Sequence, residues 1–257
     1  NIRCVCQVMN LKSLTNKVKF FDQQYTREVM LLSNAEFYQL KNNLRRITPK
    51  NDYFNQKKLF LPSLGKGRVD EFLEKLLPNT RLIIAPKIVG FAIALSYENG
   101  FLTKAISRKG NDLTNAIRTV KNIPQSISTR STLHVRGELY GRGLSPANSQ
   151  KLAARLLRKR DSDGKGLFFC SFQILNGELN YFSSLQVLER LGFEIPETEF
   201  TSYTSDVEQY RVFWREGKLF SNYPTDGIVL TVNSRKLQKQ IENKYGTCPE
   251  WQYAIKD

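Results

Sequence analysis

The chain has few of the side chains from which proteins usually build metal centres. It contains one histidine, His134, and its four cysteines form no C-x-x-C pair: Cys4, Cys6, Cys170 and Cys248. Structural zinc sites need four such ligands at short spacings, so we predict no metal site built by the protein alone. The cysteine pattern is typical of a reducing compartment. Cys170 lies in an apolar run and is predicted to be a buried free thiol.

Long hydrophobic runs are also missing. No apolar stretch approaches the roughly 20 residues that a transmembrane helix needs, so we expect no membrane association. We expect a cytoplasmic protein, bacterial or nucleoid-associated. A trimmed leader stays open, because the chain begins at Asn1 rather than at methionine.

Acidic residues are scarce relative to basic ones. The 39 Lys and Arg residues against 24 Asp and Glu residues give a formal net charge of +15. Such an excess favours a polyanionic partner, and nucleic acid fits better than an anionic membrane surface. The alternative is a basic surface that is only solvated.

The pattern of hydrophobic residues divides the chain into two parts. Apolar residues recur at three- and four-residue steps over 11–47, and Ser33 followed by Glu36 has the spacing of a capping box. We therefore predict a small helical subdomain over 1–49, with a polar linker over 48–58. The larger domain is predicted to cover 50–257.

The larger part combines strands and helices without regular alternation. Strands are predicted at 81–89, 90–98, 101–107, 132–141, 166–175, 225–232 and 250–256, with helices at 111–123, 147–160, 183–191 and 206–217. Asn99–Gly100 is a strong signal for a hairpin turn. This order indicates an α+β fold built on antiparallel sheet.

Lys87 is the one charged residue in the stretch "IIAPKIVGFAIAL". Apolar walls around a lysine favour its neutral, nucleophilic form. The alternative is a lysine whose long side chain reaches solvent from an edge strand.

Three further stretches carry charged residues beside predicted strands. In "VRGELY", strand alternation places Arg136 and Glu138 on one face, where they form either a ligand site or a structural pair. "TDGIVL" places Asp226 before a strand, which alone is a turn signal, and "EWQYAIK" ends on Lys256. In the basic helix, three cations share one face that suits a phosphate backbone, or that is only solvated: Arg155, Arg158 and Lys159.

As an ordered set these stretches resemble the adenylation domain of NAD-dependent DNA ligases. The resemblance rests on K-x-x-G, R-G-E, an apolar "FF" strand, D-G-I-V and a final W…K strand, in that order. The segments between these motifs also resemble that domain: "LPSLG", "LSYENG", "TVKNIP" and "LERLGFEI". The pairing P-K, "KAISRKGN", "LLRKRDSD" and "TDG" are closer to the DNA ligase B type. The first segment is similar to the family's small helical domain that recognises nicotinamide mononucleotide.

The resemblance implies a nucleotidyltransferase fold, which is ATP-grasp-like and shared with mRNA capping enzymes. Antiparallel sheets with flanking helices are expected, preceded by the helical subdomain. The implied activity is attack of Lys87 on NAD, giving a lysyl-AMP intermediate, and transfer of AMP to a 5′-phosphate at a DNA nick. Glu138 would contact the ribose and Lys256 the α-phosphate. Further nucleotide contacts are implied at Tyr25, Ser63, Leu64, Ile88, Arg108, Asp226 and Val229.

The resemblance also implies partners. They are nicked double-stranded DNA, contacted through Arg155, Arg158 and Lys159, and NAD with Mg²⁺ or another divalent ion. The family's C-terminal OB-fold region is missing from the sequence, which stops just past Lys256. We expect a monomer.

Several family positions differ here. K-x-D-G reads Lys87-Ile88-Val89-Gly90, so a carboxylate is lost. A glutamate that reads adenine falls on Ala85, and a lysine after D-G-V-V falls on Thr231. Other family residues fall on Thr26, Asn34, Tyr38 and Gln150, and the usual stacking aromatic falls near Ser171 and Phe172. We therefore predict impaired adenylation. The alternatives are an inactive ligase-like protein that binds nucleic acid or a partner, and a nucleotidyltransferase that uses another donor such as ATP.

Overall fold

The computed structural model describes residue 64 and residues 69–158, 164–242 and 249–256. The predicted subdomain over 1–49 and the linker lie outside the described residues, as do Tyr25, Ser63 and Lys159. Over the described part, no helix has the length and apolarity needed to cross a membrane.

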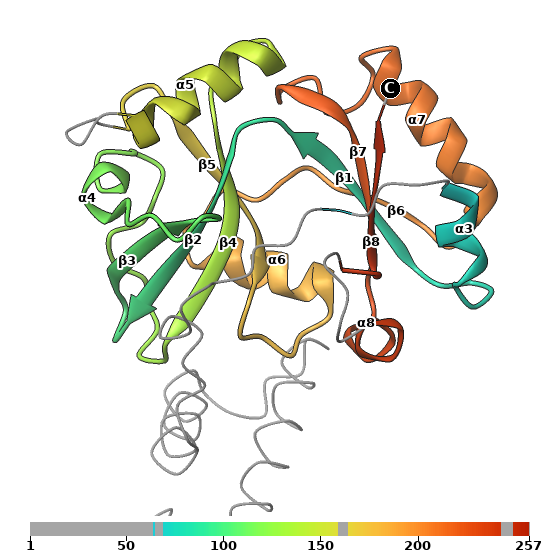
Figure 1. Cartoon of the computed structure of the whole chain (residues 1–257). Helices are drawn as coiled ribbons and strands as arrows, with labels where there is room; N and C mark the ends of the chain where they lie inside the picture. The colour runs from blue at the N-terminus through green and yellow to red at the C-terminus, as the bar shows by residue number, and fades with distance from the viewer. Residues whose placement is uncertain (1–63, 65–68, 159–163, 243–248, 257) are drawn as a thin grey trace, which may run out of the picture.

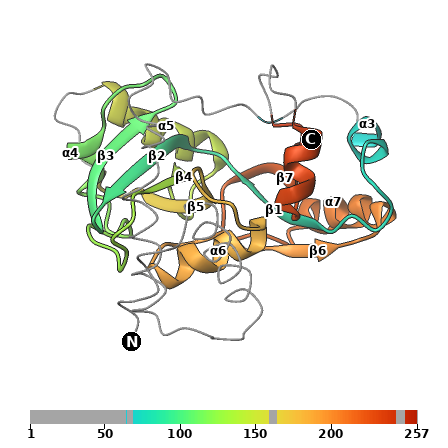
Figure 2. The same ribbon diagram turned by 90° about the horizontal axis from the view of Figure 1, so that it is seen from below.

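Two four-stranded antiparallel sheets form the body of the molecule (Figures 1 and 2). Sheet A has the order β6-β1-β7-β8 and sheet B the order β3-β2-β4-β5. Sheet A consists of β1 (Leu82–Ile88), β6 (Glu199–Thr201), β7 (Thr225–Val232) and β8 (Gln252–Lys256). Sheet B consists of β2 (Phe91–Glu98), β3 (Phe101–Ser107), β4 (Leu133–Tyr140) and β5 (Phe168–Ile174). The predicted α+β class with antiparallel sheets is confirmed.

The chain passes from sheet A to sheet B through the short segment between β1 and β2. Val89 and Gly90 are the two residues of that segment. The backbone N–H of Val89 donates to the carbonyl of Pro224, and its carbonyl accepts from the hydroxyl of Ser149. The K-x-x-G motif therefore lies where the two sheets meet.

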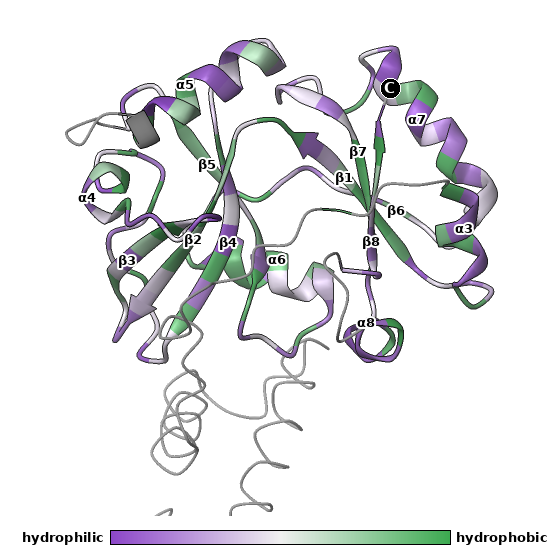
Figure 3. Cartoon of the chain, viewed as in Figure 1, coloured by the Kyte–Doolittle hydropathy of each residue, from purple (hydrophilic) through white to green (hydrophobic). Residues whose placement is uncertain are grey.

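Helices flank the two sheets, and α6 (Tyr181–Arg190) lies between them (Figure 1). The other helices are α3 (Val69–Glu74), α4 (Thr114–Ile117), α5 (Pro146–Arg158), α7 (Val207–Arg215) and α8 (Arg235–Ile241), with a 3₁₀ turn at Thr204–Asp206. Apolar and polar residues alternate along α5 and α7, whereas the sheet strands are largely apolar (Figure 3). Such amphipathic helices bury one face against the sheets and leave the other to water.

Each sheet has its own hydrophobic core. The larger cluster joins sheet B to α5, α6 and the segment after β3, with Ile93, Leu139 and Leu185 fully buried. The second cluster joins sheet A to α3, α7 and α8 through residues such as Ile84, Leu230 and Trp251. Ile83 of β1 also belongs to the larger cluster, so part of that core joins the two sheets.

Most predicted elements are present, and four elements differ from the prediction. The helix predicted over 111–123 is a single α-helical turn, Thr114–Ile117. Beyond it, the backbone N–H of Val120 donates to the carbonyl of Ile117, and that of Ile123 donates to the carbonyl of Val120. Successive tight turns therefore bury apolar residues at the same three-residue spacing, without a long helix. The short elements α3, β6 and α8 were not predicted, because three to seven residues carry too little periodicity.

The hairpin prediction is confirmed. Asn99 and Gly100 have φ angles of 52° and 87°, the left-handed conformations of a tight turn between β2 and β3. Cys170 is also a buried free cysteine, as predicted.

Candidate active site

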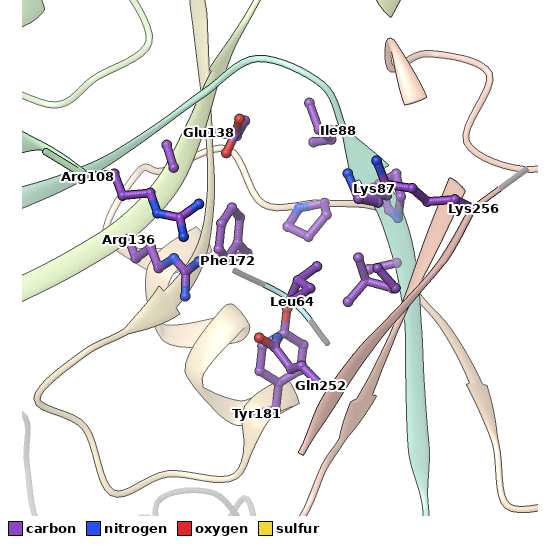
Figure 4. A pocket seen from close by; sticks show the side chains of 16 residues that line it. Leu64, Lys87, Ile88, Arg108, Arg136, Glu138, Phe172, Tyr181, Gln252 and Lys256 are labelled. Carbon is purple, nitrogen blue, oxygen red and sulfur yellow. The ribbon is translucent and has the colours of Figure 1, made fainter. Parts of the chain in front are cut away.

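A cavity of about 280 Å³ lies between the two sheets, near the lower end of the range typical of small-molecule sites. Sheet A contributes residues of β1, β7 and β8, sheet B contributes residues of β2, β4 and β5, and α6 adds Tyr181. Figure 4 shows the side chains that converge there. Cationic residues and apolar residues share the lining, which suits a ligand with an anionic part and a flat apolar part.

Lys87 is positioned by an irregularity in sheet A. The β1–β7 register pairs Pro86 with Ile228 and Ile88 with Thr225, so Lys87 lies opposite both Asp226 and Gly227. Proline has no backbone N–H to donate to a neighbouring strand, and strands commonly tolerate a proline at a bulge. The bulge brings Asp226 against Lys87.

Asp226 joins two lysines. Lys87 Nζ donates to Asp226 Oδ1 over 2.7 Å, and Lys256 Nζ donates to Oδ2 over 2.5 Å. Partial burial would raise the pKa of Asp226, but the hydrogen bonds from Lys256 and Lys87 outweigh it and lower that pKa. A single carboxylate therefore holds two cations at the cavity, in place of the wholly apolar surrounding that the sequence suggests for Lys87.

Glu138 is the carboxylate on the opposite wall. Burial raises its pKa to about 8, although the positive charges of Arg136 and Lys87 and a hydrogen bond from the Gly90 N–H act in the other direction. Arg136 lies on the same face of β4, as strand alternation predicts, and its guanidinium carbon is 5.5 Å from the ring centroid of Phe172. Glu138 is thus an acid that can change charge near neutral pH.

The motif glycines allow the strands to come close. A Cβ on Gly90 would lie 1.9 Å from the carbonyl oxygen of Leu139, and one on Gly137 would lie 2.3 Å from that of Cys170. A Cβ on Gly227 would lie 2.0 Å from the carbonyl oxygen of Ile255. All three distances are far below any real contact, so glycine is required in K-x-x-G, R-G-E and D-G-I-V for steric reasons.

The structure brings most of the predicted nucleotide-contact residues together. Among the described residues, the cavity lining includes Leu64, Lys87, Ile88, Arg108, Glu138, Val229 and Lys256. Asp226 bonds two of them. On the helix α5, Arg155 is exposed and Leu156 is buried, as the predicted division of faces requires, and the last residue is Arg158.

Other lining residues were not predicted as site residues: Arg136, Phe172, Tyr181, Pro196 and Gln252. Alternation along β8 could have identified Gln252, because Gln252, Ala254 and Lys256 occupy every second position. Phe172 could not be identified in this way, because β5 has a bulge at that residue. Tyr181 comes from a helix whose approach to the cavity has no local signal.

Of the substituted family positions, Thr26, Asn34 and Tyr38 lie outside the described residues. Ala85 is part of the lining, and Thr231 is fully buried and accepts a hydrogen bond from Gln252. Val89 is absent from the lining, although its neighbours Ile88 and Lys87 belong to it. The usual stacking aromatic is expected near Ser171 and Phe172. Ser171 is fully buried and donates to the carbonyl of Glu194, whereas Phe172 lines the cavity.

The described residues include no group of three or more His, Cys, Asp or Glu that could hold a metal ion. Glu138 is the only carboxylate in the described lining. Mg²⁺ commonly binds through one or two carboxylates together with substrate phosphates. A divalent ion here would therefore depend on the phosphate oxygens of a bound nucleotide.

Comparison with known proteins supports the ligase resemblance. Residues 34–145 match the NAD-dependent DNA ligase adenylation domain. A DNA ligase of Mycoplasma capricolum is 31% identical over 237 residues, covering 76% of this chain and 35% of that ligase. A DNA ligase of Metamycoplasma arthritidis is 29% identical over 259 residues, covering 82% of this chain and 39% of that ligase. The chain thus spans only about a third to two fifths of the length of these relatives.

Similarity to solved structures is weaker. A mycobacterial DNA ligase D complexed with ATP and MES has a TM-score of 0.47 and 15% identity, covering 76% of this chain and 58% of that chain. The family match and the alignments to bacterial DNA ligases lead to one assignment. The chain belongs to the NAD-dependent DNA ligase family and contains that family's adenylation domain.

Proposed function

We propose that this chain accepts AMP from NAD on Lys87 and passes it to a 5′-phosphate at a nick in double-stranded DNA. The observation that carries the proposal is the meeting of Lys87, Lys256, Arg108 and Glu138 at one cavity between the sheets. The family match supports NAD as the donor. The division into a recognition subdomain over 1–49 and an adenylation domain over 50–257 belongs to the same proposal.

The first step makes a phosphoramidate. The ammonium of Lys87 releases a proton to solvent, and the Nζ lone pair forms a P–N bond with the α-phosphorus of NAD. The P–O bond to nicotinamide mononucleotide breaks, and its electron pair leaves on that product's phosphate. Lys256 and Arg108 offset the charge that grows on the phosphoryl oxygens, which is the main catalytic contribution available at such a site.

The second step releases the lysine. An oxygen of the DNA 5′-phosphate attacks the adenylyl phosphorus, the P–N bond breaks, and the Lys87 amine takes up a proton. Throughout, Glu138 accepts a hydrogen bond from a ribose hydroxyl, and Asp226 keeps Lys87 and Lys256 at the cavity. A divalent ion brought in by the phosphates would supply further charge neutralisation.

The substituted positions lead us to propose that the rate is low. Loss of one electrostatic contact commonly costs roughly 3–4 kcal/mol of transition-state stabilisation, and such losses are not additive. The cavity retains its cations, so residual adenylation is expected rather than none.

The test is incubation of the chain with NAD and Mg²⁺, followed by intact mass measurement. We expect a mass increase of one AMP that is absent in Lys87→Ala. The matched control is Lys104→Ala, which removes a lysine from β3, outside the cavity lining. An unmodified mass at long times would refute the enzymatic proposal and favour the inactive nucleic-acid-binding alternative. An increment with ATP alone would favour the other donor.

Val89→Asp tests the cause of the low rate. The substitution restores the K-x-D-G carboxylate, so we expect faster labelling of Lys87 under the same conditions. A slower rate would show that this carboxylate does not limit the reaction here, and that the losses at Ala85 and Thr231 dominate.

A further inference from the structure

One end of the cavity has a polar cluster that the proposed chemistry does not use. Tyr181 of α6 and Gln252 of β8 lie at this end, whereas Lys87, Lys256 and Glu138 lie at the other (Figure 4). Thr231 of β7 connects the two polar side chains. If phosphates occupy the cationic end, as the proposed function requires, the base of the nucleotide faces this cluster.

The cluster fixes the orientation of the Gln252 amide. Its Nε2 donates to Thr231 Oγ1 over 3.1 Å. Burial raises the pKa of Tyr181, and a side-chain hydrogen bond with Thr231 acts in the other direction. Gln252 and Tyr181 are 4% and 5% exposed, and Thr231 is fully buried. One N–H of the amide is engaged by Thr231, and this orientation turns the amide oxygen away from Thr231, so that it can accept from a ligand.

Within the described part of the chain, no residue donates a hydrogen bond to Gln252 Oε1. Gln252 lines the cavity, so a ligand that supplies an N–H can donate to its amide oxygen. The cavity thus presents an acceptor at the end where the base would lie. Ala85, on the neighbouring strand β1, adds no polar group there.

Phe172 supplies a flat surface for a base. The β4–β5 register pairs Gly137 with Ser171 and Arg136 with Gln173, so Phe172 is an extra residue in β5. Bulges beside functional sites commonly redirect a side chain, and here Phe172 lies in the lining while Ser171 is buried. Aromatic rings bind any base by stacking and do not distinguish one from another, so selection must come from the polar cluster.

We propose that Gln252, held by Thr231 and Tyr181, selects a nucleobase with an exocyclic amino group by accepting a hydrogen bond from it. The inference rests on the proposed function only in assuming that the cavity binds a nucleotide. A 6-amino purine satisfies the amide oxygen. A 6-oxo purine of the same shape places oxygen against oxygen and is rejected.

The test compares AMP with inosine monophosphate, which carries a 6-oxo group in place of the 6-amino group. Calorimetric titration of the full chain is expected to give at least about tenfold tighter binding of AMP, as expected when a site built for an N–H donor meets an analogue without it. In Gln252→Leu the AMP affinity should fall to that of inosine monophosphate. In Thr231→Val the ratio should be intermediate, because the amide loses its anchor.

The control is Gln238→Leu, the same change at another buried glutamine, on α8 and outside the cavity lining. It should leave the ratio of the two affinities unchanged. The ratio is measured within each variant, so a loss of folded protein cancels.

Four outcomes are distinguishable. A ratio that falls to about one in Gln252→Leu, is intermediate in Thr231→Val and is unchanged in Gln238→Leu supports the inference. AMP binding with an unchanged ratio in Gln252→Leu overturns it and leaves the proposed function intact. Failure of both nucleotides to bind the unaltered chain overturns both. Selective AMP binding without labelling of Lys87 by NAD supports the inference and refutes the enzymatic proposal alone.

Discussion

At the scale of single residues, two carboxylates balance the charge of several cations at the cavity. Asp226 contacts Lys87 and Lys256 together, and Glu138 faces them from the other sheet. Within the described chain, Asp226 is the only acidic residue that forms an ion pair with either lysine. Removing one charge from this group therefore affects both lysines.

We expect Asp226→Asn to slow labelling of Lys87 by at least about tenfold, because an amide no longer attracts two ammonium groups to the cavity. Intact mass at timed intervals measures the rate. Asp206→Asn is the control, because Asp206 accepts a hydrogen bond from Thr201 and lies outside the cavity lining. Equal rates in Asp226→Asn and the unaltered chain would show that Asp226 does not position Lys87.

Glu138 should make stability depend on pH. Its pKa is raised from 4.5 to about 8, so the folded state favours the neutral acid. Stability from this residue is fully present below pH 4.5 and is lost as the pH rises through 8. Relative to Glu138→Gln, the unaltered chain should lose up to about 5 kcal/mol over this range, at about 1.4 kcal/mol per pKa unit.

Urea unfolding of both chains at pH 5, 7 and 9 measures this difference. The glutamine variant is the control for every other titrating group. Parallel profiles for the two chains would show that Glu138 ionises as freely in the folded state as in the unfolded state.

At the scale of elements, bulges and glycines set the site more than the strands themselves do. The irregularity in β7 places Asp226 against Lys87, and the one in β5 brings Phe172 to the lining. Gly90 lets the segment leaving β1 run against β4. These features explain why short motifs, rather than whole strands, identify the site in the sequence.

We expect Gly90→Ala to destabilise the fold by more than about 3 kcal/mol, because the added Cβ would meet backbone, which cannot move cheaply. The control is Gly143→Ala. Gly143 has φ 70° but nothing within 4 Å of its added Cβ, so it should lose only about 1 kcal/mol from backbone strain. Thermal and urea unfolding compare the two. Similar losses would mean that the strands do not approach as closely as the structure shows.

At the scale of the whole molecule, the net charge favours binding of a polyanionic partner. The net charge of +15 favours DNA through release of counterions, which makes binding steeply dependent on salt. The exposed Arg155 lies on α5 at one end of the molecule, opposite the end where α8 lies (Figure 1). If α5 contacts DNA, charge on this helix should count more than equal charge elsewhere.

We expect Arg155→Ala to weaken binding to nicked duplex and to reduce the slope of log affinity against log salt by about one contact. Lys236→Ala removes the same charge from the exposed side of α8 and is the control. Fluorescence anisotropy at several salt concentrations measures both. Equal effects of the two variants would show that only net charge matters, and that α5 is not the contact helix.

The sequence alone determined the fold class, the main strands, the hairpin at Asn99–Gly100 and the residues Lys87, Glu138 and Lys256 as candidates. These predictions depend on local chemistry, since alternation, turn residues and motif order are written along the chain. The tertiary structure decided what distant segments do together. Lys87 and Asp226 are 139 residues apart, and their ion pair exists only because a bulge aligns β1 with β7. Gln252 becomes a candidate for base recognition only when β7 supplies Thr231 and α6 supplies Tyr181. No local sequence pattern predicts these contacts, because they depend on how the two sheets enclose a cavity.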